Sequence, residues 1–309
     1  MAAIRASVFA DGNLSASQEP PAPRAVSALD EEDAAIAAFS QPTPDGRFDD
    51  EAIAFMGSLA ARRRSVILAF APKAAGTFFR SAAIDAIDGQ LVRTVHAQGE
   101  RDAQFYLPTF LSYYLDKLTP STMVTHVHMQ AFTANRHFIE ALDLKPVIMV
   151  RPIADMLTSY WDMLEQDSES RHEGLNCRIA PDFDALPRDA QADFLVDILG
   201  PWYANYFATW FDYADIAPQR VCVLDYGAFV ADPAEALRTA LAHAGLPRSC
   251  EDCQAAIEAN WSQRESMRFN RGVSGRGRDR FSASHFARLE RMLGYYRLSP
   301  RRMADLLGH

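Results

Sequence analysis

The sequence predicts an α/β protein: a three-layer α/β/α domain with a central parallel sheet. Short apolar runs rich in β-branched residues, typical of strands buried on both faces, alternate with stretches of helical periodicity. Since each parallel crossover needs a helix, this alternation favours a parallel sheet covered on both sides. The predicted strands are 65–70, 123–127, 147–150 and 220–224. The predicted helices are 77–87, 107–117, 135–142, 154–165, 202–213 and 233–244.

The chain length of 309 residues suits one large domain with an ample core. Residues 1–50 are rich in Ala and Pro and read as a mobile N-terminal extension, so the compact domain is expected at 51–309. The stretch 166–191 is acidic and lacks a clear period, which predicts a long loop. It could be a lid over a site or a solvated excursion, and the sequence leaves both open.

Composition excludes several classes of protein. Hydrophobic residues make up 49% and charged residues 23%, the ordinary balance of a soluble globular chain. A formal charge of −9 disfavours general nucleic-acid binding. No apolar run approaches the roughly 18 residues of a membrane-spanning helix, so we expect a cytoplasmic protein that does not engage a membrane. Four cysteines are too few for a disulfide framework, and we expect them to be reduced.

The first predicted strand runs into a turn of small residues, 71–77, directly before a helix. Such a turn can direct backbone N–H groups toward one point at a helix N-terminus, which binds phosphate or sulfate. Packing alone also produces small-residue turns there. The turn is not a Walker A loop, because Lys73 precedes Gly76 and no Gly-Lys pair follows.

Three collinear segments resemble motifs of sulfotransferases that use 3′-phosphoadenosine 5′-phosphosulfate (PAPS). Residues 72–77, Pro-Lys-Ala-Ala-Gly-Thr, are similar to the family's 5′-phosphosulfate loop. Residues 150–161 resemble the 3′-phosphate motif, with Arg151, Asp155 and Ser159 at its characteristic spacing. Residues 270–281 are similar to the C-terminal Arg-Lys-Gly-x-x-Gly segment that closes over the nucleotide. The resemblance implies a P-loop NTPase-like sulfotransferase fold, PAPS as co-substrate and 3′,5′-adenosine bisphosphate (PAP) as product.

The resemblance also implies the residues of the nucleotide site. The expected contacts to the phosphosulfate and adenine are Lys73, Ala75, Gly76, Thr77, Phe78 and Phe79. The expected contacts to the 3′-phosphate are Arg151, Ser159, Arg271 and Gly272. Phe79 is the candidate for stacking on adenine, and a core role is the alternative.

The third segment departs from the family pattern, because Asn270 replaces the usual first Arg and Arg271 replaces Lys. Residues 264–280 hold six arginines against two acidic residues, a local charge of +4 in an acidic chain. Glycines at 272, 275 and 277 would let the backbone approach a ligand closely. A flexible basic loop is the alternative interpretation.

Two histidines are candidates for the general base. Thr125-His126 matches the family's Thr-His at the end of a strand, and His128, two residues on, faces the same side. Imidazole suits proton abstraction near neutral pH, and we favour His126, with His128 as a substrate contact. Some members of the resembled family use a carboxylate, so a Glu or Asp base is the alternative. Lys73 would stabilise charge on the departing phosphate, so no metal is required.

Two rival functions stay open. In a P-loop kinase or NTPase, Asp225 after an apolar strand would hold Mg²⁺. A nucleotide-binding protein that keeps the fold without catalysis is the other. If the chain is an enzyme, the acceptor is expected to be a hydroxyl or amine of a small molecule or carbohydrate, which the sequence does not specify. Oligomeric state is also not readable.

Overall fold

The computed structural model describes residues 54, 57–58, 64–92, 122–166, 179–180, 182–262 and 274–309. The chain divides into two units, Met1–Gln41 and Pro42–His309, and every described residue belongs to the second. The predicted extension 1–50, the predicted helix 107–117, and the expected ligands Arg271 and Gly272 lie outside the described residues.

The described strands form one parallel sheet in the order β2-β3-β1-β4-β5. Their bounds are β1 Ser65–Leu68, β2 Gln90–Leu91, β3 Met123–His126, β4 Pro146–Val150 and β5 Cys222–Asp225. In the centre of the sheet, Leu68 of β1 pairs with His126 of β3 on one side and with Val147 of β4 on the other. The predicted α/β class with a central parallel sheet is therefore confirmed.

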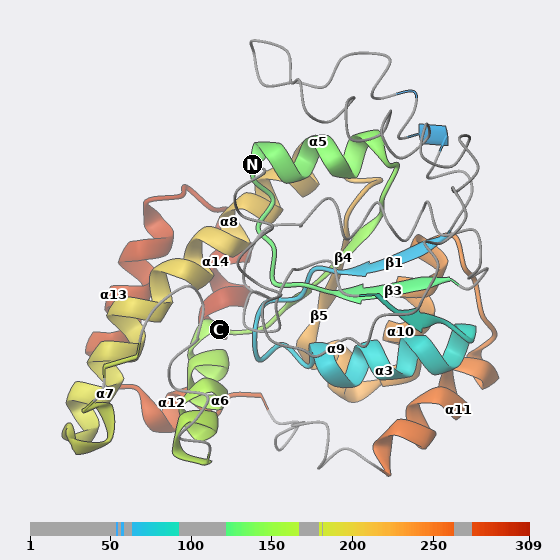
Figure 1. The fold of residues 1–309 in the computed structure, drawn as a ribbon. Helices are drawn as coiled ribbons and strands as arrows, with labels where there is room; N and C mark the ends of the chain where they lie inside the picture. Colours follow the sequence, from blue (N-terminus) through green and yellow to red (C-terminus); the bar gives the residue numbers. More distant parts are fainter. Residues whose placement is uncertain are drawn as a thin grey trace, which may run out of the picture. The chain divides into compact units, whose positions relative to one another are not determined.

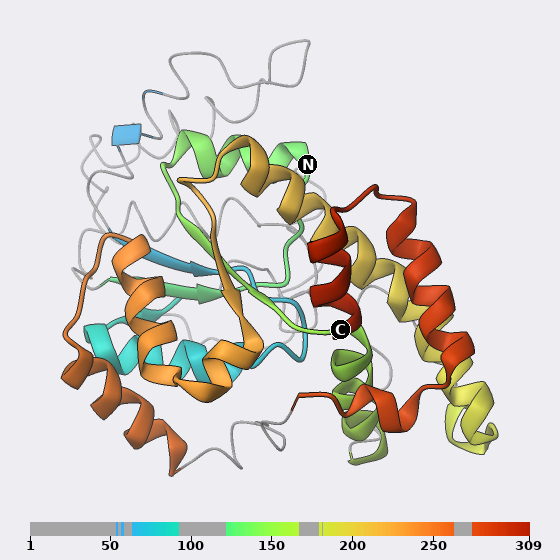
Figure 2. The same ribbon diagram turned by 180° about the vertical axis from the view of Figure 1, so that it is seen from behind.

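Helices cover both faces of this sheet (Figure 1). One face carries α5 (Thr133–Ala141) and α8 (Gly200–Ile216). The other carries α3 (Gly76–Ile87), α9 (Tyr226–Ala231), α10 (Pro233–His243) and α11 (Cys250–Trp261). The view from behind shows the same two layers (Figure 2). This arrangement explains the buried apolar runs 66–68 in β1, 123–124 in β3 and 146–150 in β4: neither face of the sheet meets water at these residues.

Two residues separate β4 from the helix α6 (Ile153–Gln166). This helix begins the part of the chain that lies beside the sheet. Among the described residues, that part of the chain also contains two helical turns and four further helices. They are η3 (Phe183–Ala185), α7 (Arg188–Phe194), η4 (Leu195–Leu199), α12 (Gly277–Arg280), α13 (Ala283–Gly294) and α14 (Pro300–Leu307).

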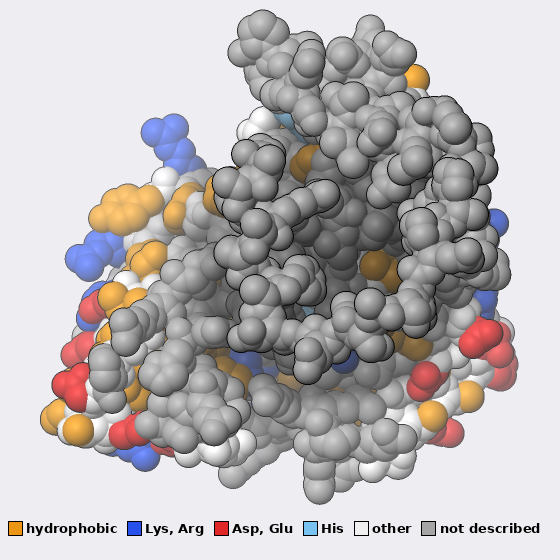
Figure 3. All heavy atoms as spheres, in the orientation of Figure 1, with side chains coloured by type: hydrophobic (Ala, Val, Ile, Leu, Met, Phe, Trp, Pro, Cys, Tyr) orange, Lys and Arg blue, Asp and Glu red, His pale blue; other side chains and the backbone are white. Residues whose placement is uncertain are grey.

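Ion pairs join these helices at the surface. Arg288 of α13 pairs with Asp193 and with Asp197, the latter at 2.7 Å. In Figure 3, acidic, basic and hydrophobic side chains interleave on the flank where α7 and α13 lie.

None of the helices in the described residues combines the length and the apolar composition that a membrane span requires.

Two sequence predictions need correction. The predicted loop 166–191 contains η3 and the start of α7. The helix α7 is held against α6, because its buried Gln191 accepts a hydrogen bond from the Trp161 indole at 3.0 Å. The last strand is shifted to 222–225, because residues 217–220 form a turn closed by the Arg220 N–H to the Ala217 carbonyl. Local periodicity could not show either contact.

Aromatic side chains of α8 anchor the backbone that leaves the sheet. The Tyr206 hydroxyl donates to the Ala69 carbonyl after β1, and the Trp210 indole donates to the Met129 carbonyl after β3 at 3.0 Å. Tyr203, one turn earlier, donates to the Pro72 carbonyl at 3.1 Å. All three rings are fully buried. They satisfy carbonyls that have left the sheet ladder, and so hold these loops in place.

Tyr206→Phe should lower the free energy of unfolding by about 1–3 kcal/mol, because it leaves the buried Ala69 carbonyl without its donor. Urea unfolding followed by circular dichroism measures the change. The matched control is Tyr295→Phe, since Tyr295 is 75% exposed, and it should change stability by less than about 0.5 kcal/mol. Equal stability of Tyr206→Phe and the unmutated protein would contradict the anchoring role.

Candidate anion-binding site

The turn between β1 and α3 has the geometry of an anion cradle. Lys73 and Ala75 both have positive φ, 67° and 64°, although neither is glycine. Such left-handed residues store strain and concentrate at functional sites. Ala75 is the N-cap of α3, and no side chain of the described residues caps this helix end. The first-turn N–H groups and the positive end of the helix dipole therefore point toward a place where an anion would be stabilised.

Gly76, the first residue of α3, lies against the imidazole of His126. A Cβ atom built on Gly76 would fall 2.1 Å from His126 Nε2, closer than any real contact. Glycine is required here because β3 delivers the His126 ring directly onto the start of the helix. His126 is therefore at the mouth of the cradle.

His128 is buried beside His126. The two rings are 4.8 Å apart between centroids and nearly perpendicular. His128 is buried, and its Nδ1 is 2.7 Å from the Phe70 carbonyl. Because a carbonyl only accepts, Nδ1 carries the proton and donates, which leaves Nε2 as the acceptor nitrogen. Of the two candidate bases, His126 is the one in contact with the cradle residue Gly76.

Arg151 follows β4 and reaches back to the same turn. Its Nη1 donates to the Lys73 carbonyl at 2.5 Å, and its guanidinium lies over the Tyr226 ring at 4.1 Å from the centroid. The side chain is buried, and its Nε–H donates to no group in the described residues. Burial lowers the pKa of Arg151, while Tyr226 and Asp155 act to raise it. A buried, charged guanidinium with an unused donor needs a further acceptor, and an anion would supply it.

Lys73 and Thr77 lie on either side of the helix start and are half-buried. The Lys73 ammonium is 3.6 Å from the Met163 sulfur, so its side chain reaches α6. The Thr77 carbonyl accepts from the Ser81 hydroxyl at 3.1 Å within α3.

Phe78 and Phe79 are buried among other rings. Phe79 packs 5.2 Å from Phe70 and 5.7 Å from Phe229, and Phe78 packs 5.7 Å from Trp261. Neither side chain exposes more than 1% of its surface. This packing favours the core role given above as the alternative for Phe79, and adenine stacking stays a prediction.

Two glycines of the C-terminal segment, Gly275 and Gly277, lie against α6. Asp155 accepts from the Gly275 N–H and the Gly277 N–H, each at 2.7 Å. Gly275 has φ of 88°, and a Cβ on Gly277 would meet Ala154 at 2.5 Å. These two glycines therefore permit a close approach to the protein's own carboxylate and helix.

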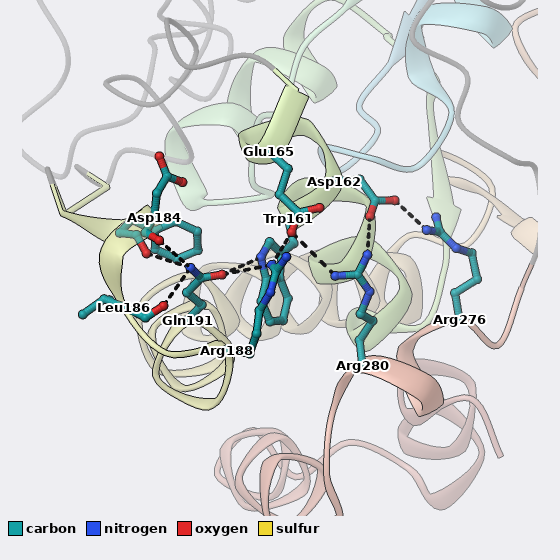
Figure 4. A network of polar contacts seen from close by, with 10 residues as sticks. Trp161, Asp162, Glu165, Asp184, Leu186, Arg188, Gln191, Arg276 and Arg280 are labelled. Carbon is teal, nitrogen blue, oxygen red and sulfur yellow. Dashed lines mark hydrogen bonds and ion pairs between the residues drawn. The ribbon is translucent and has the colours of Figure 1, made fainter.

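Two arginines of this segment are also paired with α6 (Figure 4). Asp162 accepts from Arg276 at 2.6 Å and from Arg280 at 3.1 Å. Arg280 and Arg188 lie over the Trp161 ring at 5.3 and 5.4 Å. The expected basic loop is thus partly neutralised by acidic residues of α6. Sequence reasoning missed Asp162, although its spacing of seven residues from Asp155 puts both on one helix face.

Asp225, the residue that would hold Mg²⁺ in a P-loop kinase or NTPase, ends β5. It is the N-cap of α9 and accepts from the Ala228 N–H at 2.7 Å. Among the described residues, no group of three or more His, Cys, Asp or Glu side chains could hold a metal ion.

Comparison with known proteins places the fold. A mouse sulfotransferase complexed with PAP has a TM-score of 0.57 and 14% identity, covering 84% of this chain and 95% of that one. Retinol dehydratase complexed with androsterone and inactive cofactor PAP has a TM-score of 0.46, with 12% identity over 88% of this chain and 96% of that one. A sulfotransferase from Alicyclobacillus acidocaldarius has a TM-score of 0.45, with 13% identity over 80% of this chain and 96% of that one. No protein-family model and no curated protein matches the sequence. The likeness to the mouse structure shows that this chain has a sulfotransferase-type fold.

Gly76→Ala should destabilise the protein by about 1–3 kcal/mol, because the new methyl group overlaps the His126 ring. In the His126→Ala background, the same substitution should cost at least about 1 kcal/mol less, which a double-mutant cycle in urea would measure. Gly294→Ala is the control: Gly294 is also helical but has open space around its Cβ position, so alanine should stabilise there. A penalty at Gly76 that is independent of His126 would contradict this contact.

Proposed function

We propose that the protein is a PAPS-dependent sulfotransferase that transfers a sulfonate group to a hydroxyl or amine of a small-molecule or carbohydrate acceptor. The observation that carries the proposal is the convergence of the uncapped α3 N-terminus, the His126 imidazole and the buried Arg151 guanidinium at one edge of the sheet. The fold of the PAP-bound mouse sulfotransferase supports it.

The chemistry of the site fits an anionic nucleotide. The helix end and Lys73 suit the 5′-phosphosulfate, and the unused Nε–H of Arg151 suits the 3′-phosphate. Ala75, Gly76 and Thr77 would donate backbone N–H groups to the first of these.

The nucleotide supplies the sulfonate group, whose bond to a phosphate oxygen breaks as the acceptor oxygen or nitrogen bonds to sulfur. His126 accepts the proton that the acceptor loses. Lys73 and the first-turn N–H groups of α3 stabilise the negative charge that develops on the departing phosphate. His128, with Nδ1 held by Phe70, keeps its ring fixed beside His126. The rate then depends on positioning and electrostatics, as in phosphoryl transfer.

Incubation of the purified full chain with PAPS and a panel of phenols, alcohols, amines and sugars tests the proposal. Mass spectrometry should detect an acceptor whose mass rises by one sulfonate group, with PAP as the second product. PAP binding without transfer to any acceptor would favour the non-catalytic nucleotide-binding protein instead. Magnesium-dependent hydrolysis of ATP would favour the kinase or NTPase.

Lys73→Ala and His126→Ala should each lower turnover at least about 100-fold, the usual effect of losing one charge-stabilising or proton-transferring group. Turnover at saturating PAPS measures this loss, and circular dichroism verifies folding. Lys145→Ala and His137→Ala are matched controls: Lys145 precedes β4 at the opposite end of the strand from Arg151, and His137 lies on α5. Near-normal turnover in a folded Lys73 or His126 variant would remove the role assigned to that residue.

A further inference from the structure

One face of α6 carries three buried polar side chains: Asp155, Ser159 and Asp162. Their spacing of four and three residues puts them in a row along the helix axis, with Ser159 in the middle. Asp155 and Asp162 are about 10 Å apart along this axis at a rise of about 1.5 Å per residue.

Arg276 is tied to both ends of this row. Its two chain neighbours, Gly275 and Gly277, donate their N–H groups to Asp155, so the Arg276 backbone is held at the first turn of α6. Its guanidinium donates to Asp162, two turns further along. The Arg276 side chain therefore runs along α6 from Asp155 to Asp162 and passes the position of Ser159.

The ion pair of Arg276 can be exchanged without leaving the Asp162 carboxylate unpaired. Asp162 keeps a second partner, Arg280, at 3.1 Å if Arg276 turns away. A guanidinium has five N–H donors, and the contact with Asp162 occupies one Nη of Arg276 in the described structure. Its side chain is 15% exposed, so an anion reaching it would bind in a largely desolvated place.

The charge of Arg276 also influences the pKa values of Arg151 and Tyr226. Burial is the main cause that lowers the pKa of Arg151, and the positive charge of Arg276 lowers it further. For Tyr226, burial raises the pKa, and both arginines oppose this rise. Two cations near one another in a buried region are stabilised when a multiply charged anion binds between them.

We infer that Arg276 is a phosphate-binding residue of the nucleotide site, completing a 3′-phosphate subsite with Arg151 and Ser159. Asp155 positions its backbone, and Asp162 holds its guanidinium until the phosphate replaces that partner. The inference rests on the proposed nucleotide substrate. It adds a phosphate-binding residue outside the Arg-Lys-Gly-x-x-Gly pattern, because Arg276 comes immediately after Gly275. The loss of the usual first Arg at Asn270 would be offset by this residue.

Calorimetric titration of the full chain with PAP and with adenosine 5′-monophosphate, which lacks the 3′-phosphate, tests the subsite. Arg276→Gln should weaken PAP binding at least about tenfold and leave adenosine 5′-monophosphate binding within about twofold, because only the 3′-phosphate contact is lost. Arg276→Lys should fall between, since lysine keeps the charge and loses the planar fork. The matched control is Arg278→Gln: Arg278 is two residues on and donates to the Gly308 carbonyl.

Asp162→Asn separates a binding role from a structural one. It should bind PAP at least as tightly as the unmutated protein, because the competing carboxylate is removed. An Arg276→Gln variant that keeps the preference for PAP, or weakens both nucleotides equally, would overturn the inference. So would an Asp162→Asn variant that loses the preference as Arg276→Gln does. If the unmutated protein fails to bind PAP, the proposed function itself fails, and the subsite with it.

Discussion

Parallel pairing of β3, β1 and β4 is the constraint on which the candidate site depends. The three strands are parallel, so their carboxyl ends lie at the same edge of the sheet. The cradle turn, His126 and Arg151 each follow a strand end, and parallel strands bring such ends together. A strand running the other way would carry its polar residue to the opposite edge of the sheet, away from the N-terminus of α3.

The turn after β1 has a strained backbone, and contacts from three other parts of the chain stabilise it. Lys73 and Ala75 adopt left-handed conformations that alanine and lysine disfavour. Arg151 donates to the Lys73 carbonyl, Tyr203 of α8 donates to the Pro72 carbonyl, and His126 packs on Gly76. Each of these contacts comes from a different part of the chain. The strained turn is therefore stable only once the sheet and α8 are assembled, which is the usual condition for strain at a functional site.

Acidic residues of α6 shape the second half of the site. Asp155 uses both carboxylate oxygens to bind the N–H groups of Gly275 and Gly277, and Asp162 pairs with two arginines. These buried charges are satisfied by hydrogen bonds and ion pairs, so their desolvation is offset. Their effect is to attach a glycine- and arginine-rich segment of a net acidic protein to the helix that begins just after Arg151. A charge count along the chain cannot reveal this neutralisation.

The sequence by itself determined the α/β class, the central strands within one or two residues, and the small-residue turn before α3. These depend on hydrophobic period and on residue size, which are local properties. Only the tertiary structure decided that His126 contacts Gly76 with His128 buried beside it, that Phe78 and Phe79 pack in the core, and that Gly275 and Gly277 donate to Asp155. Each of these depends on contacts between residues far apart in the chain, whose geometry is set when layers of helix and sheet pack together.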